Sequence, residues 1–401
     1  VSPLSRAQAS YAALLDQNRA SAAKYDALYG PLDLQTAPVI QATLEGMAPR
    51  TEAMTVALGS AALDSVSRFH RDRLALSGSG SAQGGTLTVI GKPTQLLAMN
   101  EFNAGGMVAS DASTASVQEG TLPPDMQGFI AAGYVDGSSA PSTGLLVRPG
   151  RDNFSGYYVA AGIERLVSQG SMFGLSLSYA ALDGDASGAA QAVENELYQG
   201  TLYGRRTLAN DWSVDGQIGV GSITTNTIRA FNFLGSGVAL KSDDTALATS
   251  AELGFQKAIS FGSWRVDPRI SGRFSHLGFS DATETGGVQA LRFQRRAYDS
   301  AQVRVGFAAS KVVGNFRPYL TSFVVHDFDD DQPETVKANF AGGIGPDQSF
   351  GLFNGARDWA EISAGVKYSS GAMAFSLGVD STIGRDDVRS QSYRGSFSLQ
   401  F

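Results

Sequence analysis

The side chains in this sequence that could do chemistry are histidines, clustered aspartates and charged residues in extended segments. The three histidines, His70, His276 and His326, lie in unrelated segments, and no pair has the spacing of metal ligands. The aspartate run at residues 329–331 lacks the regular oxygen-ligand spacing of a calcium loop. The sequence has neither a nucleophile elbow nor a phosphate-binding P-loop. We therefore expect no catalytic, cofactor-binding or metal-binding residue, and a protein that is not an enzyme.

The composition narrows the classes of function. The 401 residues carry 31 basic and 38 acidic side chains, a net charge of −7, which disfavours nucleic acid as a partner. The chain has no cysteine, so disulfides, cysteine nucleophiles and thiolate metal sites are excluded. No stretch approaches the roughly 18–20 apolar residues of a spanning helix. The mean hydropathy of −0.08 still suits a membrane β-barrel, whose polar lumen positions balance its apolar outer ones.

The elements that must position any functional residue are strands. From residue 126 to the end, apolar and small or polar residues alternate; Phe173, Leu175 and Leu177, for example, alternate with Gly174 and Ser176. A period of two with one polar face is typical of half-buried strands. About twelve such segments are predicted, near residues 127–135, 154–167, 170–181, 195–208, 211–224, 244–259, 263–279, 299–312, 315–328, 358–369, 372–383 and 392–401.

The connections between these segments alternate in length. Turns of a few residues alternate with long loops, which we expect near 136–153, 182–194, 225–243, 280–298, 329–357 and 384–391. A membrane barrel has this pattern, with short periplasmic turns at one end and longer outer loops at the other. A sheet in hydrocarbon must also close on itself to satisfy its backbone. The sequence therefore predicts an all-β transmembrane fold over residues 126–401, an antiparallel outer-membrane β-barrel of about twelve strands.

Charged residues on the polar face of these strands must point into a wet lumen. An arginine or lysine facing lipid at mid-depth costs about 2–4 kcal/mol. Arg265, Arg269 and Arg273 are four residues apart, so they form a positive ladder on one face of one strand. They could pair with acidic lumen residues, or contact a segment that fills the pore. The predicted lumen-facing charges are Glu252, Arg265, Arg269, Arg273, Arg304 and Glu361, with Glu164, Arg205 and Lys367 on the same face.

The outer face and the strand ends carry aromatic residues. We expect aromatic girdles at the two membrane interfaces, where the amphipathic rings belong. The residues expected near strand ends are Tyr157, Trp212, Trp264, Tyr368, Tyr393 and Phe401.

The region before the strands divides into two parts. Residues 1–75 read as a helical region next to a passenger, with helices over about 7–29, closed by a stop at Gly30-Pro31, then over 39–47 and 51–74. His70 is expected on a solvated helix face. Residues 76–125 read as a linker that could thread the pore. A twelve-stranded lumen has room for one helix or one extended strand. Spacing alone does not choose between the helix ending at Leu74 and residues 100–125 as the occupant.

Together these features resemble the C-terminal translocator of the autotransporters, the type V secretion family. The segment 319–328, YLTSFVVHDF, is similar to one common in a late strand of these barrels, and residues 29–34 and 48–52 resemble the helical region upstream of alphaproteobacterial members. The ending GSFSLQF resembles the signal read by the outer-membrane assembly machinery, although a glycine is usual where Ser396 stands. The resemblance assigns this assembly signal to Tyr393, Gly395, Phe397, Leu399 and Phe401.

The resemblance implies an outer-membrane protein of a Gram-negative bacterium that exports an N-terminal passenger to the cell surface and anchors it. The linker would cross the lumen, with the N-terminal region at the cell surface or in the lumen. The implied partners are outer-membrane lipids and lipopolysaccharide, the barrel assembly machinery and the protein's own passenger, expected upstream of Val1. No cofactor and no nucleic acid are expected. The alternatives are an outer-membrane pore, channel or barrel enzyme, and a structural barrel that anchors a larger surface assembly through residues 1–125.

Overall fold

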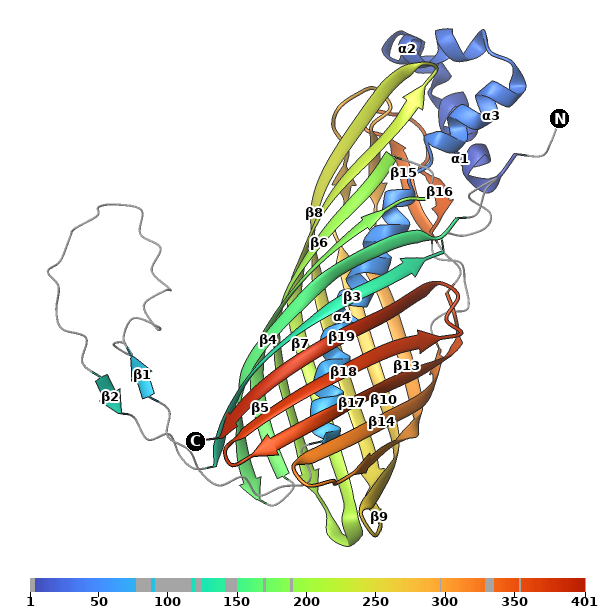
Figure 1. Ribbon diagram of the computed structural model, residues 1–401. Helices are drawn as coiled ribbons and strands as arrows, with labels where there is room; N and C mark the ends of the chain where they lie inside the picture. The colour runs from blue at the N-terminus through green and yellow to red at the C-terminus, as the bar shows by residue number, and fades with distance from the viewer. Residues whose placement is uncertain are drawn as a thin grey trace, which may run out of the picture.

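The fold consists of a helical head, a single long helix and a β-barrel around that helix (Figure 1). The computed structural model describes residues 4–76, 88–90, 117–119, 125–140, 150–168, 171–187, 190–295, 297–328, 335–352 and 355–400. Within these residues, α1 to α3 form the head, α4 stands inside the barrel, and most of the strands from β3 onward form the wall. The short strands β1 (Thr88–Ile90) and β2 (Val117–Glu119) pair only with each other.

The barrel wall contains twelve long antiparallel strands among the described residues, joined at its rim by the short β9 (Ile259–Phe261). The long strands are β3 (Met126–Ser139), β4 (Asp152–Ser168), β5 (Ser171–Asp185), β6 (Ala190–Thr207), β7 (Trp212–Phe233), β8 (Ser236–Lys257), β10 (Trp264–Phe279), β13 (Ala297–Lys311), β14 (Phe316–Asp327), β17 (Asp358–Ser370), β18 (Met373–Ile383) and β19 (Val388–Gln400).

The sheet closes on itself. β10 pairs with both β8 and β13, and the last strand, β19, pairs with the first, β3, over thirteen residue pairs from Val388↔Ser139 to Gln400↔Gln127. Every long strand therefore has two hydrogen-bonded neighbours, and no long edge is left open. The prediction of a closed antiparallel barrel of about twelve strands is confirmed.

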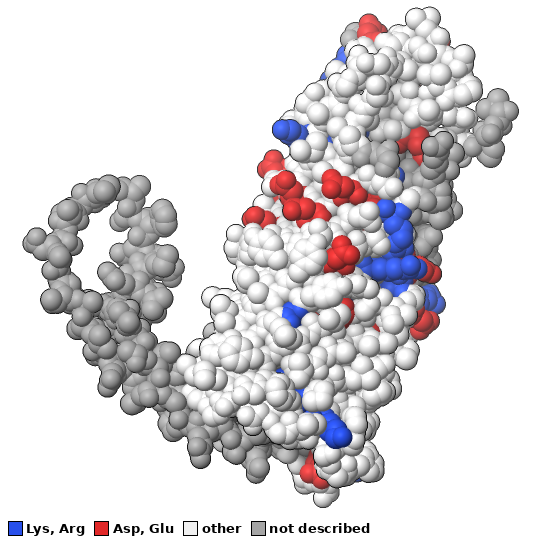
Figure 2. Space-filling model, viewed as in Figure 1, with Lys and Arg blue, Asp and Glu red and all other residues white. Residues whose placement is uncertain are grey.

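The alternation in the sequence becomes the two faces of the wall. Along β5, exposed and buried side chains alternate, with Phe173, Leu175 and Leu177 exposed and Ser176 buried. On the face seen in Figure 2, the lower part of the barrel is largely uncharged, and most charged side chains lie nearer the head. The inward face carries the buried charged and polar side chains, together with apolar ones, and meets α4. One face is thus suited to hydrocarbon and the other to a polar lumen.

The predicted aromatic positions divide into two groups. Trp212 and Trp264 begin β7 and β10 at the end of the barrel with short turns, as expected. Tyr157 and Tyr393 instead lie within β4 and β19, on either side of Tyr134, which pairs with both. Their strands continue for several residues beyond this tyrosine row toward the long-loop end. The expectation that these two tyrosines end their strands is therefore wrong, because the barrel extends beyond its apolar band.

The long-loop end is more ordered than the sequence pattern suggests. The loop expected at 225–243 is absent, because β7 and β8 pair through this region to a two-residue turn at Leu234 and Gly235. Both turn residues have positive φ, 51° and 95°, as a tight hairpin requires. Parts of the loops expected at 280–298 and 329–357 form a separate four-stranded sheet, which contains β11 (Ala282–Thr283), β12 (Leu291–Gln294), β15 (Thr335–Phe340) and β16 (Gln348–Gly351).

The head packs against this small sheet. It contains α1 (Arg6–Asn18), a short 3-10 turn, α2 (Ala22–Asp33) and α3 (Ala37–Gly46). Ser5 begins α1 with a capping box to Gln8. The helix stop predicted at Gly30-Pro31 is wrong, because α2 continues through Pro31 to Asp33. Leu28 and Leu32, one turn apart and both buried in the core, offset the backbone hydrogen bond that the proline cannot donate.

The helix α4 (Arg50–Leu76) stands in the lumen (Figure 1). Met54, Leu58 and Phe69 on one face belong to the same buried cluster as the lumen residues Leu182, Ile223 and Tyr203. Its first residue contacts Asp152 near the long-loop end, and the carbonyl of Leu74 contacts Arg205 near the short-turn end. The helix therefore runs the length of the lumen. None of the described helices combines the length and hydropathy that a transmembrane helix requires.

Candidate functional site: a charged lumen filled by a helix

The centre of the lumen is held by carboxylates that each contact several guanidinium groups. Asp64 of α4 contacts Arg273 of β10 and, at 3.3 Å, Arg385 beside β19. Glu361 of β17 accepts from Arg71 of α4 at 2.8 Å and lies 3.3 Å from Arg68. All these side chains are buried. Because the carboxylates and arginines come from both the helix and the wall, each pair fixes α4 to the barrel.

The outer third of α4 is held in the same way. Arg50 contacts Asp152 of β4 at 2.5 Å, and Glu52 accepts two hydrogen bonds of 2.9 Å from Arg295. Arg295 also contacts Asp244 of β8. Glu52 thus connects the first turn of α4 to two different segments of the wall.

The last turns of α4 are held near the short-turn end. Asp72 contacts Arg394 of β19, and Arg73 makes a two-point contact with Glu164 of β4. Arg205 of β6 donates a 2.9 Å hydrogen bond to the carbonyl of Leu74. A cation at the carbonyl end of a helix interacts favourably with the helix dipole and satisfies an otherwise unpaired carbonyl. Arg205 therefore also acts as a cap for α4.

The predicted ladder of three arginines lies on the lumen side of β10, and its members have different partners. Arg265 contacts Asp267 at 2.8 Å, close to the short-turn end. Arg269 contacts Asp215 at 2.5 Å and Glu252 at 3.2 Å, both on the wall. Arg273 contacts Asp64 of α4. Along this one strand, therefore, Arg265 and Arg269 pair with acidic residues of the wall, and Arg273 contacts the segment that fills the pore.

The other predicted lumen charges lie in the same network. Arg304 of β13 is fully buried and lies 3.4 Å from Glu361. Glu164 is shared by Arg73, Tyr203 and Gln127. The structure thus brings Arg304 and Glu361 together, whereas Arg265 lies apart with its own aspartate.

The residues assigned to the assembly signal lie on the closing strand. Tyr393 is half exposed on the outer face, opposite Tyr134, and Phe397 stacks its ring 4.9 Å from that of Phe375 on β18. Gly395 and Leu399 follow the same outward alternation, and Phe401 lies outside the described residues. Tyr393, Phe397 and Leu399 therefore lie on the outer face of the barrel, at the seam between β19 and its neighbours.

One pair in the lumen has the geometry of a nucleophile and its base. His70 Nε2 lies 2.6 Å from Ser176 Oγ, and His70 Nδ1 lies 2.8 Å from the carbonyl oxygen of Val66. The expectation of a solvated His70 is wrong, because its side chain is 0% exposed. Ser176 is 1% exposed, so a substrate cannot reach it without removal of α4. In this arrangement the pair joins helix to wall.

At the long-loop end a buried ion pair holds the head. Arg229 of β7 is 0% exposed and makes hydrogen bonds of 2.7 and 2.5 Å to Glu284. The same guanidinium donates to the carbonyl oxygen of Met47, between α3 and α4, and to the hydroxyl of Tyr11 in α1. Burial raises the pKa of the Tyr11 phenol above its ordinary value. One arginine of the wall thus joins the head to the small four-stranded sheet.

Sequence reasoning missed the charged residues of α4. Asp64, Arg68 and Asp72 are each four residues apart, and Arg71 follows Arg68 by three, so they form a polar stripe. The apolar stripe was visible in the sequence, but its charged counterpart suggested solvent exposure. A charged stripe beside a barrel with unpaired lumen charges is the signal that could have identified the contact.

The comparisons with known proteins begin with a family model. The model of the autotransporter beta-domain matches residues 147–381, which is more than half of the chain. No curated protein sequence matches the chain significantly. The matched residues include most of the wall and its lumen charges.

Solved structures show the same kind of barrel. The translocator domain of the autotransporter NalP from Neisseria meningitidis is 10% identical, with a TM-score of 0.53 over 70% of this chain and 90% of that chain. The beta domain of the Bordetella autotransporter BrkA is 13% identical, with a TM-score of 0.46 over 68% of this chain and 99% of that one. The toluene transporter TodX of Pseudomonas putida is 10% identical, with a TM-score of 0.44 over 81% and 99%.

At such low identity the NalP match supports the fold alone, and the two lower scores support no further argument. The family is shown by the match of residues 147–381, which contain most of the strands of the closed barrel. This chain belongs to the autotransporter beta-domain family.

Proposed function

We propose that this barrel exported a passenger through its lumen and now anchors it at the cell surface, with α4 left in place as the last exported segment. The observation that carries the proposal is the path of the chain. The head lies at the long-loop end, α4 runs down the lumen, and β3 begins the wall at the short-turn end (Figure 1). In a barrel of the bacterial outer membrane the long loops face outward.

This path has a physical consequence for the order of events. The wall is continuously hydrogen bonded, including the β3–β19 seam, so α4 cannot enter through the side of the finished barrel without breaking strand pairs. The head carries charged residues and lies beyond the apolar band. A route through the lumen, during or after closure of the wall, avoids moving these charges through hydrocarbon.

We also propose the partners that such a barrel requires. The assembly machinery of the outer membrane would recognise β19 through Tyr393, Gly395, Phe397, Leu399 and Phe401, because this strand is the last of the wall and pairs with the first. Lipopolysaccharide would surround the outer part of the wall, above the row of Tyr134, Tyr157 and Tyr393. These assignments give the barrel transport and anchoring, rather than catalysis, as its function.

An open channel is less well supported. The lumen of the described barrel contains α4, fixed by ion pairs at Glu52, Asp64 and Asp72 along its length. A solute would have to displace this helix. A role as anchor for a larger surface assembly stays compatible with the exposed head.

A surface-display experiment tests the proposal. An epitope is joined to the N-terminus of the chain behind a signal peptide, and intact cells are stained with an antibody. We expect staining of intact cells that external protease removes, with the barrel still folded by its heat-modifiable mobility. As a control, a charged residue replaces Leu399 on the outer face of β19, which should reduce both the folded barrel and the staining. Staining that appears only after permeabilisation, with a folded barrel, would contradict the proposal.

A further inference from the structure

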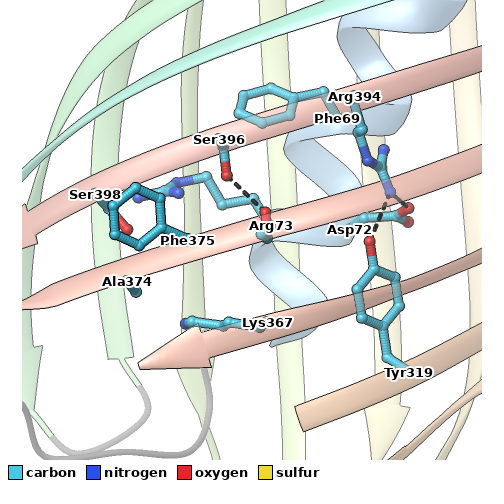
Figure 3. A pocket seen from close by; sticks show the side chains of 11 residues that line it. Phe69, Asp72, Arg73, Tyr319, Lys367, Ala374, Phe375, Arg394, Ser396 and Ser398 are labelled. Atoms are coloured by element: carbon cyan, nitrogen blue, oxygen red, sulfur yellow. Dashed lines mark hydrogen bonds and ion pairs between the residues drawn. The ribbon is translucent and has the colours of Figure 1, made fainter. Parts of the chain in front are cut away.

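A large apolar groove lies on the outer face of the barrel wall. It has a volume of about 890 Å³ and crosses β6, β7, β8, β10 and β13. Binding sites for small organic ligands have volumes of roughly 300–1,000 Å³, so the groove has room for a hydrocarbon chain. The cavity inside the barrel, beside Asp72, Arg394 and Tyr319, holds only about 40 Å³ and is too small for such a ligand (Figure 3).

The floor of the groove is made of small residues. They point outward from neighbouring strands of the wall and are Gly204, Gly216, Ala251, Gly272 and Ala301. Gly204 pairs directly with Gly216. A Cβ atom added at Gly272 would have no heavy atom within 4 Å apart from its chain neighbours, so the space above it is open. The half-exposed side chains that rise around the floor are Phe173, Leu202, Ile218, Leu253, Phe274 and Phe328.

The groove lies in the half of the apolar band that is nearer the long-loop end. Trp264 begins β10 in the aromatic girdle at the short-turn end, and Gly272 follows it by eight residues. At about 3.3 Å per residue and a strand tilt of about 40°, Gly272 lies about 20 Å from Trp264 along the barrel axis, within a band about 25 Å tall. On β7, Gly216 follows Trp212 by four residues, which is about 10 Å on the same scale. The groove therefore rises from mid-depth to the outer edge of the band.

Two histidine–aspartate pairs lie next to the upper end of the groove. His276 is the next outward residue beyond the lining of β10, and its Nδ1 lies 2.6 Å from Oδ1 of Asp299. His326 stands opposite the lining residue Val303, and its Nδ1 lies 2.8 Å from Oδ1 of Asp358. All four polar side chains are partly exposed. The apolar groove thus ends at a polar cluster on the same face of the wall.

This polar cluster lies at the depth of lipid headgroups. His276 follows Trp264 by twelve residues, which is about 30 Å along the axis and beyond the apolar band. In each pair Nδ1 donates to the aspartate, and no residue that the structure describes makes a hydrogen bond with Nε2. The Nε2 of a neutral imidazole accepts from a sugar hydroxyl, and that of an imidazolium donates to a phosphate. The cluster is therefore suited to a headgroup of sugar and phosphate.

We propose that this groove binds lipopolysaccharide, with an acyl chain along the groove and the sugar-phosphate headgroup at the two histidine–aspartate pairs. The site rests on the orientation proposed above, in which the long-loop end faces outward. The occupant is a lipid, because the groove opens onto the apolar face that hydrocarbon covers in the outer membrane. It is a lipid of the outer leaflet, because the polar cluster lies at the outer edge of the band.

The test measures the lipid that the purified full-length protein retains, by native mass spectrometry after detergent exchange, with synthetic lipid A as the probe. We expect the wild type to retain a single lipid A. Gly272→Leu and Ala251→Leu fill the groove and should lower the retained fraction about tenfold or more, with the heat-modifiable mobility unchanged. Ala364→Leu is the matched control, because Ala364 is exposed on the outer face of β17, outside the groove, and should leave retention unchanged.

The headgroup contacts are tested by a second set of variants. The double variant His276→Ala/His326→Ala keeps the groove open and should lower the retention of lipid A to that of phosphatidylglycerol, which has acyl chains and a phosphate but no sugar. Binding is measured on the purified barrel, so its loss leaves export untouched, and the surface-display experiment reports on export alone. Equal retention of lipid A by the wild type and by folded Gly272→Leu and Ala251→Leu would overturn the proposal. A wild type that retains no lipid A, or that retains phosphatidylglycerol equally well, would also overturn it.

Discussion

Replacing Asp64 by asparagine should loosen α4 in the lumen without opening the barrel wall. The Asp64 carboxylate contacts Arg273 and Arg385 of the barrel and lies 3.8 Å from Arg68, one turn further along the helix. The amide of asparagine has nearly the same size but no charge. Among the residues that the structure describes, the substitution therefore leaves the buried Arg273 without a carboxylate partner, while Arg385 keeps Asp387 at 3.0 Å.

The expected loss of free energy that holds α4 in the lumen follows from the ion pairs that Asp64 makes. Removing one partner of a buried ion pair costs about 3–5 kcal/mol. The lumen is polar and Arg385 keeps a partner, so we take the lower end. A free-energy change of about 3 kcal/mol raises the population of undocked α4 roughly 150-fold, at about 1.4 kcal/mol for each factor of ten. The strand pairs of the wall do not involve Asp64, so the barrel should stay closed.

The assay uses the absence of cysteine in the sequence. A single Ser67→Cys substitution places a thiol on α4 at a position that is 3% exposed. The rate at which a maleimide labels this thiol follows the population of open states when reclosing is faster than labelling. Asp64→Asn should raise the rate by about two orders of magnitude. Asp33→Asn is the matched control, because Asp33 pairs with Arg19 on the exposed head, where solvent screens such a pair and it contributes little to stability.

Equal labelling rates in the Asp64→Asn and wild-type backgrounds would refute this reasoning, provided that the urea-unfolded proteins label rapidly. Such a result would mean that the apolar face of α4 holds the helix and that the central ion pairs contribute little.

Three further substitutions test other parts of the structure. Arg229→Ala leaves Glu284 buried without its arginine partner. External trypsin should therefore cut the head of this variant faster than that of the wild type on intact cells, while the barrel stays heat-modifiable. Arg205→Gln removes the cation from the carbonyl end of α4, worth about 0.3–1 kcal/mol, and should speed hydrogen exchange only in the last helical turn. Leu377→Arg puts a charge on the outer face of β18 and should cost about 2–4 kcal/mol in urea unfolding from lipid vesicles; an unchanged midpoint would place Leu377 outside the hydrocarbon.

The strands of the wall could be predicted because their pattern is local. Phe173, Leu175 and Leu177 face outward only if the chain is extended, and a run of such segments requires a closed sheet. The hairpin of β7 and β8 could not be predicted in the same way. Its turn contains Leu234, a residue that rarely adopts a positive φ, so the usual turn signal of asparagine or aspartate before glycine is missing.

Of the charged lumen site, the arginines of the wall could be predicted from the sequence, but their partners could not. Arg269 and Arg273 could be placed in the lumen from the alternation of their strand, but their partners could not be identified. Asp215 lies on β7 and Asp64 on α4, so the pairing depends on strand register and on which segment enters the lumen. Likewise, α2 continues through Pro31 because Leu28 and Leu32 pack in the core. The local Gly30-Pro31 signal contains no information about this packing.

The most direct test of the account is the side of the membrane on which each end of the barrel lies. Single cysteines are introduced at Leu34, which is 85% exposed on the head, and at Asn315, in a short turn, and intact cells are treated with a membrane-impermeant maleimide. The account predicts that the cysteine at position 34 is labelled on intact cells, and that the one at position 315 is labelled only after the outer membrane is permeabilised. Labelling of position 315 but not position 34 on intact cells would contradict it.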